Sequence, residues 1–129
     1  MSVWDDHEMT DAVVGILSAL PLREPDHHFG RPWLTAYQLS VEVERLHPEA
    51  FAAFGDNPGG AGSGSPFSVP QRLARELSGR IKNDPLLPIE GADLCTLRVG
   101  TLTFVRGNGE IVESSQSGSD PLAMFRYRH

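Results

Sequence analysis

The chain has 129 residues, about the length of one domain, and its hydrophobic (40%) and charged (22%) shares are ordinary for a globular protein. No run of about 18 apolar residues occurs, which excludes a membrane-spanning helix. The formal net charge of −6 is unevenly divided. Residues 1–68 carry three basic and ten acidic side chains, whereas residues 69–129 carry eight basic and seven acidic ones, so an anionic ligand would meet the C-terminal half.

The first predicted helix covers residues 10–20, where apolar side chains recur at helical spacing. Thr10 is its expected N-cap. Ser2 offers an earlier start, which would bring Trp4 onto the same helix. Residues 21–33 contain three prolines and one glycine, and we expect an irregular segment there.

The second predicted helix begins after Thr35, which forms a capping-box pattern with Gln38 three residues later. Its apolar face is expected to be buried and consists of Ala36, Leu39, Val43 and Leu46. A short helical continuation follows at Pro48 and ends at Gly55.

Residues 55–65 contain five glycines and almost no side chain that could be buried. Such a segment cannot offset the entropy lost on ordering, so we expect a flexible loop. It lacks the Gly-Lys-Ser/Thr sequence with which a P-loop binds phosphate and magnesium. The chain is therefore predicted to be a single domain, residues 1–129, with one flexible Gly-rich loop.

The third predicted helix covers residues 69–83, with Ser68 as N-cap and Gln71 completing a second capping box. Its core-facing positions recur every four residues and are Val69, Leu73, Leu77 and Ile81. An i, i+4 ladder that satisfies its own charges consists of Arg72, Glu76 and Arg80. The face left for a partner carries Gln71, Arg75 and Lys82. Gly79 costs about 1 kcal/mol relative to Ala in a helix and marks close backbone packing or a fraying end.

Residues 101–106 and 110–113 flank the sequence Gly-Asn-Gly at 107–109, which predicts a β-hairpin. A three-residue loop would pair Arg106 with Glu110, Val105 with Ile111 and Phe104 with Val112. A two-residue loop of Asn108 and Gly109 is the competing register. The alternating tail at 120–128 is predicted to be a closing strand of the same small sheet.

No catalytic, metal or cofactor site is predicted. His27 and His28 are adjacent in a loop, where extended neighbours point to opposite sides and do not chelate one ion. Residues 94–99 alternate with period two, so Cys95, the single cysteine, is expected in a strand as a small buried hydrophobe. The chain contains no Gly-x-Ser-x-Gly nucleophile motif, and no nucleophile has a visible base beside it.

The order helix, helix, helix, hairpin over residues 34–113 resembles a winged helix-turn-helix module. The resemblance implies an α+β fold, in which a three-helix bundle carries a C-terminal hairpin or small antiparallel sheet. It also implies that helix 69–83 is the recognition helix and that hairpin 101–113 is the wing.

We expect a non-enzymatic protein-interaction or accessory subunit, because the aromatic residues exceed the needs of one small core: Trp33, Phe51, Phe54, Phe67, Phe125 and Tyr127. A DNA-binding transcriptional regulator is the alternative. The net negative charge, the self-satisfied arginines and the long Gly-rich loop weigh against DNA. For either partner the candidate contact residues are Gln71, Arg75, Lys82, Arg106, Arg126 and Arg128. A lone cysteine and an acidic N-terminus favour a cytoplasmic protein, and a homodimer is compatible with both readings.

Overall fold

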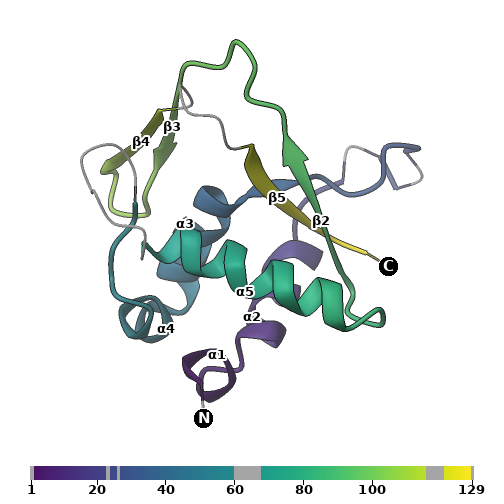
Figure 1. Ribbon diagram of the computed structural model, residues 1–129, viewed down its shortest axis with the longest axis horizontal. Coiled ribbons are helices and arrows are strands. Elements are labelled where there is room, and N and C mark those ends of the chain that lie inside the picture. Colours follow the sequence, from purple (N-terminus) through teal and green to yellow (C-terminus); the bar gives the residue numbers. More distant parts are fainter. Residues whose placement is uncertain (1, 23, 26, 60–67, 116–120, 129) are drawn as a thin grey trace.

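The computed structural model describes residues 2–22, 24–25, 27–59, 68–115 and 121–128 (Figure 1). The fold is α+β, as the sequence predicts. The helices are α1 (Val3–Asp6), α2 (Met9–Ser18), α3 (Ala36–Leu46), α4 (Pro48–Ala53) and α5 (Val69–Asn83). The strands are β1 (Leu34–Thr35), β2 (Ile89–Leu94), β3 (Thr101–Val105), β4 (Ile111–Ser115) and β5 (Leu122–Tyr127). Within the described ranges, no helix is long and apolar enough to span a bilayer.

The N-terminal residues form two separate helices. Ser2 caps α1, because its hydroxyl accepts a hydrogen bond from the backbone N–H of Asp5 at 3.1 Å. The expectation that Thr10 caps the next helix is wrong, since α2 already begins at Met9. The Thr10 hydroxyl instead accepts the indole N–H of Trp4 at 2.9 Å. Trp4 is fully buried, so this bond satisfies its one polar group within the core and ties α1 to α2.

Helix α3 begins with the predicted capping box. The backbone N–H of Gln38 donates to the Thr35 hydroxyl at 3.1 Å, and the Gln38 side chain accepts the Thr35 N–H at 2.8 Å. The predicted burial of Leu46 is wrong, because α3 ends there and leaves this side chain 47% exposed. Helix α4 then packs Phe51 into the core, and Phe54, the residue after α4, is buried there as well.

Helix α5 covers the predicted residues, but the capping box predicted at Ser68 and Gln71 is wrong. Ser68 is buried and its side chain makes no capping hydrogen bond to the helix. The backbone N–H of Val69 instead donates to the carbonyl of Asn57 at 2.8 Å. The predicted core face is confirmed for Val69, Leu73 and Leu77, and Ile81 is partly buried against it.

The predicted Gly-rich loop is only partly described: residues 60–65 lie outside the described ranges. At its beginning, Gly59 has a positive φ of 78° and donates its N–H to the side chain of Asn57 at 2.9 Å. A Cβ on Gly59 would lie 3.2 Å from the Ser68 hydroxyl. This part of the segment therefore contacts the start of α5 closely, and only glycine fits there without strain.

A three-stranded antiparallel sheet has the order β1–β5–β2. β5 is its central strand and pairs Phe125 with Leu34 on one side and with Gly91 on the other. The tail is therefore a strand, as predicted, but the expectation that it joins the hairpin's sheet is wrong. Its partners are β1, which was not predicted, and β2, which ends at Leu94, where the strand expected around Cys95 would begin.

The β3–β4 hairpin forms a separate two-stranded sheet with the three-residue loop. Val105 pairs with Ile111, and the backbone N–H of Arg106 donates to the carbonyl of Glu110 at 2.8 Å. The expectation for Cys95 is wrong: it follows the end of β2 and is exposed. The alternating pattern there belongs to a turn, closed by the N–H of Val99 on the carbonyl of residue 96 at 2.9 Å.

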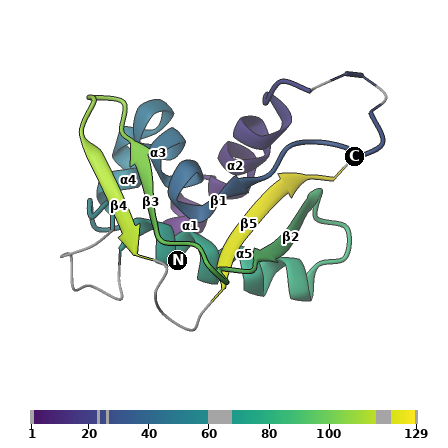
Figure 2. The ribbon, with the colours of Figure 1, turned by 90° about the horizontal axis from the view of Figure 1, so that it is seen from above.

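One apolar core lies where α2, α3 and α5 meet the three-stranded sheet, which contributes Ile89 and Phe125. The hairpin lies at the other end of the molecule, beside α3 and α4 (Figure 2). Of the six aromatic residues expected to exceed the core, Phe51, Phe54 and Phe125 are buried. Trp33 and Tyr127 are partly buried, and Phe67 lies outside the described residues. Among those described, these aromatics therefore form no exposed apolar patch.

Candidate functional site

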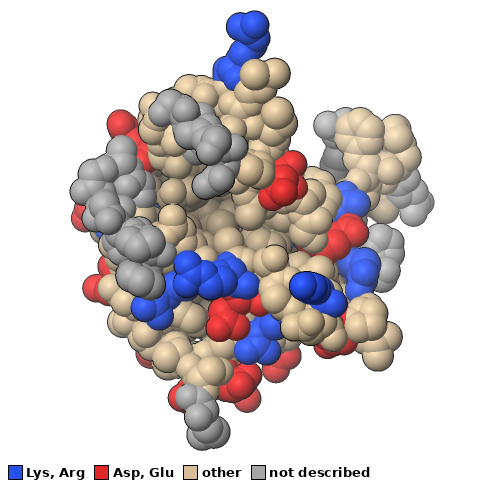
Figure 3. All heavy atoms as spheres, viewed as in Figure 1, with Lys and Arg blue, Asp and Glu red and all other residues tan. Residues whose placement is uncertain are grey.

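The outer side of α5 carries three of the predicted contact residues. Gln71, Arg75 and Lys82 are all exposed. Within the described part of the chain, none of these three side chains forms a hydrogen bond or an ion pair. Residues 69–83 contain four basic residues and one acidic residue, a balance of +3 in a chain of net charge −6. Figure 3 shows basic side chains gathered over this helix.

The predicted charge ladder on α5 is present for Glu76 and Arg80, whose side chains lie 3.3 Å apart. Arg80 also reaches Asp5 of α1 at 3.7 Å and lies over the ring of Trp4, 5.0 Å from its centroid. The guanidinium of Arg80 thus contacts Glu76, Asp5 and the ring face of Trp4. These contacts stabilise the packing of α1 against α5. Arg80 therefore has its partners inside the protein, whereas the side chain of Arg75 has none among the described residues.

Gly79 lies on the exposed side of α5 between Arg75 and Lys82. A Cβ at this position would meet no atom within 4 Å, so packing inside the protein does not require glycine here. Of the two explanations given for Gly79, close backbone packing within the chain is therefore wrong. Arg75 and Gly79 border an open hollow of about 530 Å³ next to the start of α2. Because Gly79 has no side chain, the backbone of α5 is accessible from this hollow.

Arg106 holds the hairpin against α3. Its Nε donates to Glu44 Oε1 at 3.0 Å, and its Nη2 donates to the second oxygen of the same carboxylate. Its Nη1 reaches Glu110 at 3.4 Å. The hydrogen bonds to Glu44 raise the pKa of Arg106 above its ordinary value, against a smaller lowering by burial. Phe104 stacks on Tyr37 of α3, with ring centroids 5.1 Å apart, and completes this contact.

Arg126 and Arg128 connect β5 to neighbouring segments. Arg126 forms an ion pair with Glu90, its partner residue on β2, and donates to the carbonyl of Phe29 at 2.8 Å. Its guanidinium lies 4.4 Å from the ring centroid of Trp33. Arg128 donates to the carbonyls of residues 85 and 87, each at 2.7 Å. The structure thus separates the six candidates into three free residues on α5 and three arginines with partners inside the protein.

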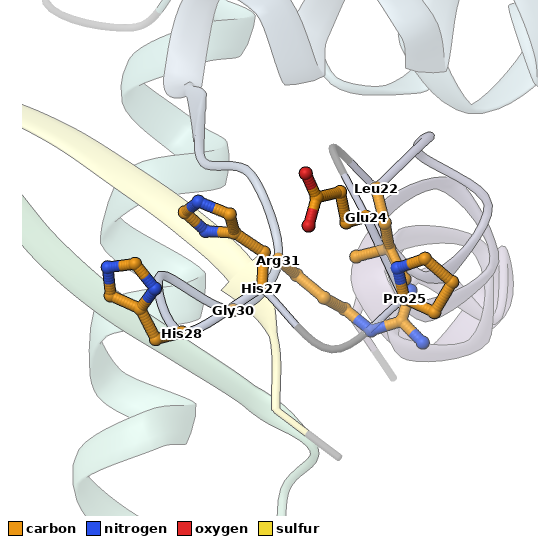
Figure 4. A pocket seen from close by; sticks show the side chains of 7 residues that line it. All are labelled: Leu22, Glu24, Pro25, His27, His28, Gly30 and Arg31. Atoms are coloured by element: carbon orange, nitrogen blue, oxygen red, sulfur yellow. The ribbon is translucent and has the colours of Figure 1, made fainter.

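The adjacent histidines do not point to opposite sides, which corrects the expectation for this loop. The rings of His27 and His28 stack with centroids 4.4 Å apart, in a turn that Gly30 closes with a φ of 78° (Figure 4). They line an open hollow of about 490 Å³ together with Glu24 and Arg31. Across the described ranges, no group of three or more His, Cys, Asp or Glu side chains is placed to hold a metal ion.

One exposed arginine outside the predicted set lies in the turn between β2 and β3. Arg98 has a φ of 62°, an uncommon backbone conformation for a residue with a side chain. Its neighbour Leu97 is 77% exposed. The sequence carries no local signal for this turn, because the alternation around Cys95 is typical of a strand.

The free residues of α5 are donors for anionic or hydrogen-bonding partners. Gln donates and accepts through its amide, Arg presents a planar fork of donors, and Lys presents a point charge. These three side chains are therefore suited to direct contact with a binding partner. Comparison of the chain with protein-family models, curated proteins and solved structures found no match.

Proposed function

We propose that this protein binds duplex DNA through the exposed side of α5, as the recognition helix of a winged-helix-like domain. The layout supports this proposal: β1 lies between α2 and α3, and α5 is followed by β2 and β5. The three strands form one sheet in the order β1–β5–β2. In a winged helix the strands after the recognition helix flank the wing, and β2 and β5 are in that position.

In this arrangement the wing is the whole segment between β2 and β5, and the β3–β4 hairpin is an insertion within it. The hairpin is bound to α3 by Arg106 and Glu44. We therefore assign Arg106 to holding the hairpin and Arg126 to holding β5, not to DNA contact. The DNA contacts fall to Gln71, Arg75 and Lys82.

The observation that carries the proposal is the row of unpartnered polar residues on a locally basic helix. Gln and Arg recognise base edges, and Arg and Lys bind phosphates. Protein interfaces instead centre on buried aromatic or aliphatic anchors. Among the described residues, every large exposed hydrophobic side chain lies outside α5. The chemistry of this surface favours DNA over the accessory-protein reading.

The proposal also gives an expected salt dependence. Two free cations, Arg75 and Lys82, correspond to about two phosphate contacts, and the logarithm of affinity should fall with a slope of about −2 against the logarithm of salt concentration. The net charge of −6 opposes binding, so the complex forms best at low salt. A second copy on the same duplex would double the number of contacts.

The test is fluorescence anisotropy with a labelled duplex of about 20 base pairs, across a salt series starting near 20 mM. The Arg75→Gln/Lys82→Gln variant should lose at least tenfold in affinity and most of the salt slope. Arg45→Gln is the control for loss of a positive charge elsewhere, because Arg45 is an exposed arginine on α3, paired with Glu42 at 2.8 Å. Absence of saturable binding by the unmodified protein, or equal binding by the double variant, would overturn the proposal.

A further inference from the structure

A second surface lies on α2, away from the exposed side of α5. It is an open groove of about 520 Å³ between α2 and the corner where α3 meets α4. Its apolar lining is Ala12, Gly15, Ile16 and Leu46, and the acidic side chains of Glu8 and Asp11 also line it. The two remaining lining residues are His7 and His47, and no arginine or lysine lines this groove. An apolar groove bordered by acidic side chains suits an apolar side chain that has a basic residue beside it.

Two residues of the groove, Leu46 and Gly15, lower the stability of the isolated chain. Leu46 is 47% exposed, although it continues the apolar face of α3. Gly15 lies in the interior of α2, where glycine costs about 0.5–1 kcal/mol relative to Ala. A Cβ at Gly15 would meet no atom within 4 Å, so the protein's own packing does not require glycine there. Both features leave the groove open and apolar for a molecule from outside.

The same chain presents a matching projection at the turn between β2 and β3. Leu97 is 77% exposed, and Arg98 beside it is exposed in a left-handed conformation. The hydrogen bond from the Val99 N–H to residue 96 holds this turn in shape at 2.9 Å. In Figure 1 the turn lies at the top of the molecule, at the opposite end from α1 and α2.

Among the large exposed hydrophobics of the described residues, Leu97 is the one with an adjacent free arginine. Arg45 beside Leu46 pairs with Glu42, and Arg106 beside Val105 pairs with Glu44. The neighbours of Phe29, Leu86 and Ile111 in the chain include no arginine or lysine. Helix α5 is basic, but its apolar side chains are buried in the core.

We propose that the groove binds the turn at Leu97 and Arg98 of a second copy of this chain. Leu97 then covers Leu46 and Gly15, and Arg98 faces Glu8 and Asp11. Because the turn and the groove lie at opposite ends of the molecule, the contact joins copies head to tail, with the turn of one copy in the groove of the next. The contact is small, so the association is weak and reversible. This inference does not depend on DNA binding.

The test is sedimentation velocity of the full chain over a range of about 10 µM to 1 mM. We expect reversible self-association, in which the average mass rises with concentration, weakened at least tenfold by Leu97→Glu or Leu46→Glu. Leu86→Glu is the matched control, since Leu86 is 88% exposed and does not line the groove. If Leu46→Glu disrupts the fold, Leu97→Glu still provides the test. Leu97 lies in an exposed turn, so its substitution keeps the fold intact.

A charge exchange tests the pairing itself. Arg98→Glu should weaken the self-association, and adding Asp11→Arg to that variant should restore it. Gly15→Gln should block the groove, whereas Gly15→Ala should raise the melting temperature. A strictly monomeric protein, or self-association unaffected by Leu97→Glu, would overturn the proposal.

Discussion

Replacing Arg106 by Gln should release the β3–β4 hairpin from α3. The guanidinium makes two hydrogen bonds to Glu44, and the side chains of the two residues are only 17% and 23% exposed. The substitution keeps most of the side-chain volume but leaves the Glu44 carboxylate without its cation. Its second partner, Glu110, is more exposed and lies 3.4 Å away, so it adds little.

The degree of burial sets the size of the effect. Exposed ion pairs contribute about 0.2–1 kcal/mol, and removing one partner of a fully buried pair costs about 3–5 kcal/mol. For a pair about one-fifth exposed, we expect Arg106→Gln to lower the free energy of unfolding by about 1.5–3 kcal/mol. The pKa of Arg106 is raised, so its stabilisation is complete at pH values below its unfolded pKa. It is lost only as the pH rises through the raised value.

The assay is a double-mutant cycle by urea unfolding with Arg106→Gln, Glu44→Gln and the double variant. We predict a coupling energy of about 1–2 kcal/mol. DNA affinity measured on folded Arg106→Gln should remain that of the unmodified protein. A coupling energy below about 0.3 kcal/mol would show that the ring contact of Phe104 and Tyr37 and the buried Val112 hold the hairpin without the ion pair.

Three further substitutions test separate parts of the fold by denaturant unfolding. Thr35→Ala removes the capping box of α3 and should cost about 1 kcal/mol; an unchanged stability would show that the cap contributes nothing. Gly79→Ala should stabilise the protein by about 0.5–1 kcal/mol, because its Cβ meets no neighbour, and a loss of stability would contradict this. Arg126→Gln should cost about 2 kcal/mol through lost bonds to Glu90 and Phe29; a cost below about 0.5 kcal/mol would refute that role.

The sequence predicted best those features whose partners are close in the chain. The capping box at Thr35 and Gln38 spans three residues, and the hairpin loop at 107–109 specifies its own turn. Helix 69–83 was predicted from one apolar face. In each case the chemistry that forms the element is contained in a single short window.

Features that depend on distant partners were not predictable in the same way. β2 contains Gly91 and Ala92, which have low strand propensity, and it is a strand because β5 pairs with it. The sequence also does not show which arginines have partners inside the protein and which are free. Arg106 meets Glu44 from 62 positions away, and only the folded chain brings them together.

The most direct test of the central proposal is an NMR titration of the ¹⁵N-labelled full chain with duplex DNA at low salt. If α5 is the contact helix, the largest amide shift changes should fall within residues 71–82. The amides near Glu44 and Arg106 should stay unchanged. Shift changes centred on hairpin 101–113, or none at saturating duplex, would contradict the assignment of α5 as the DNA-binding element.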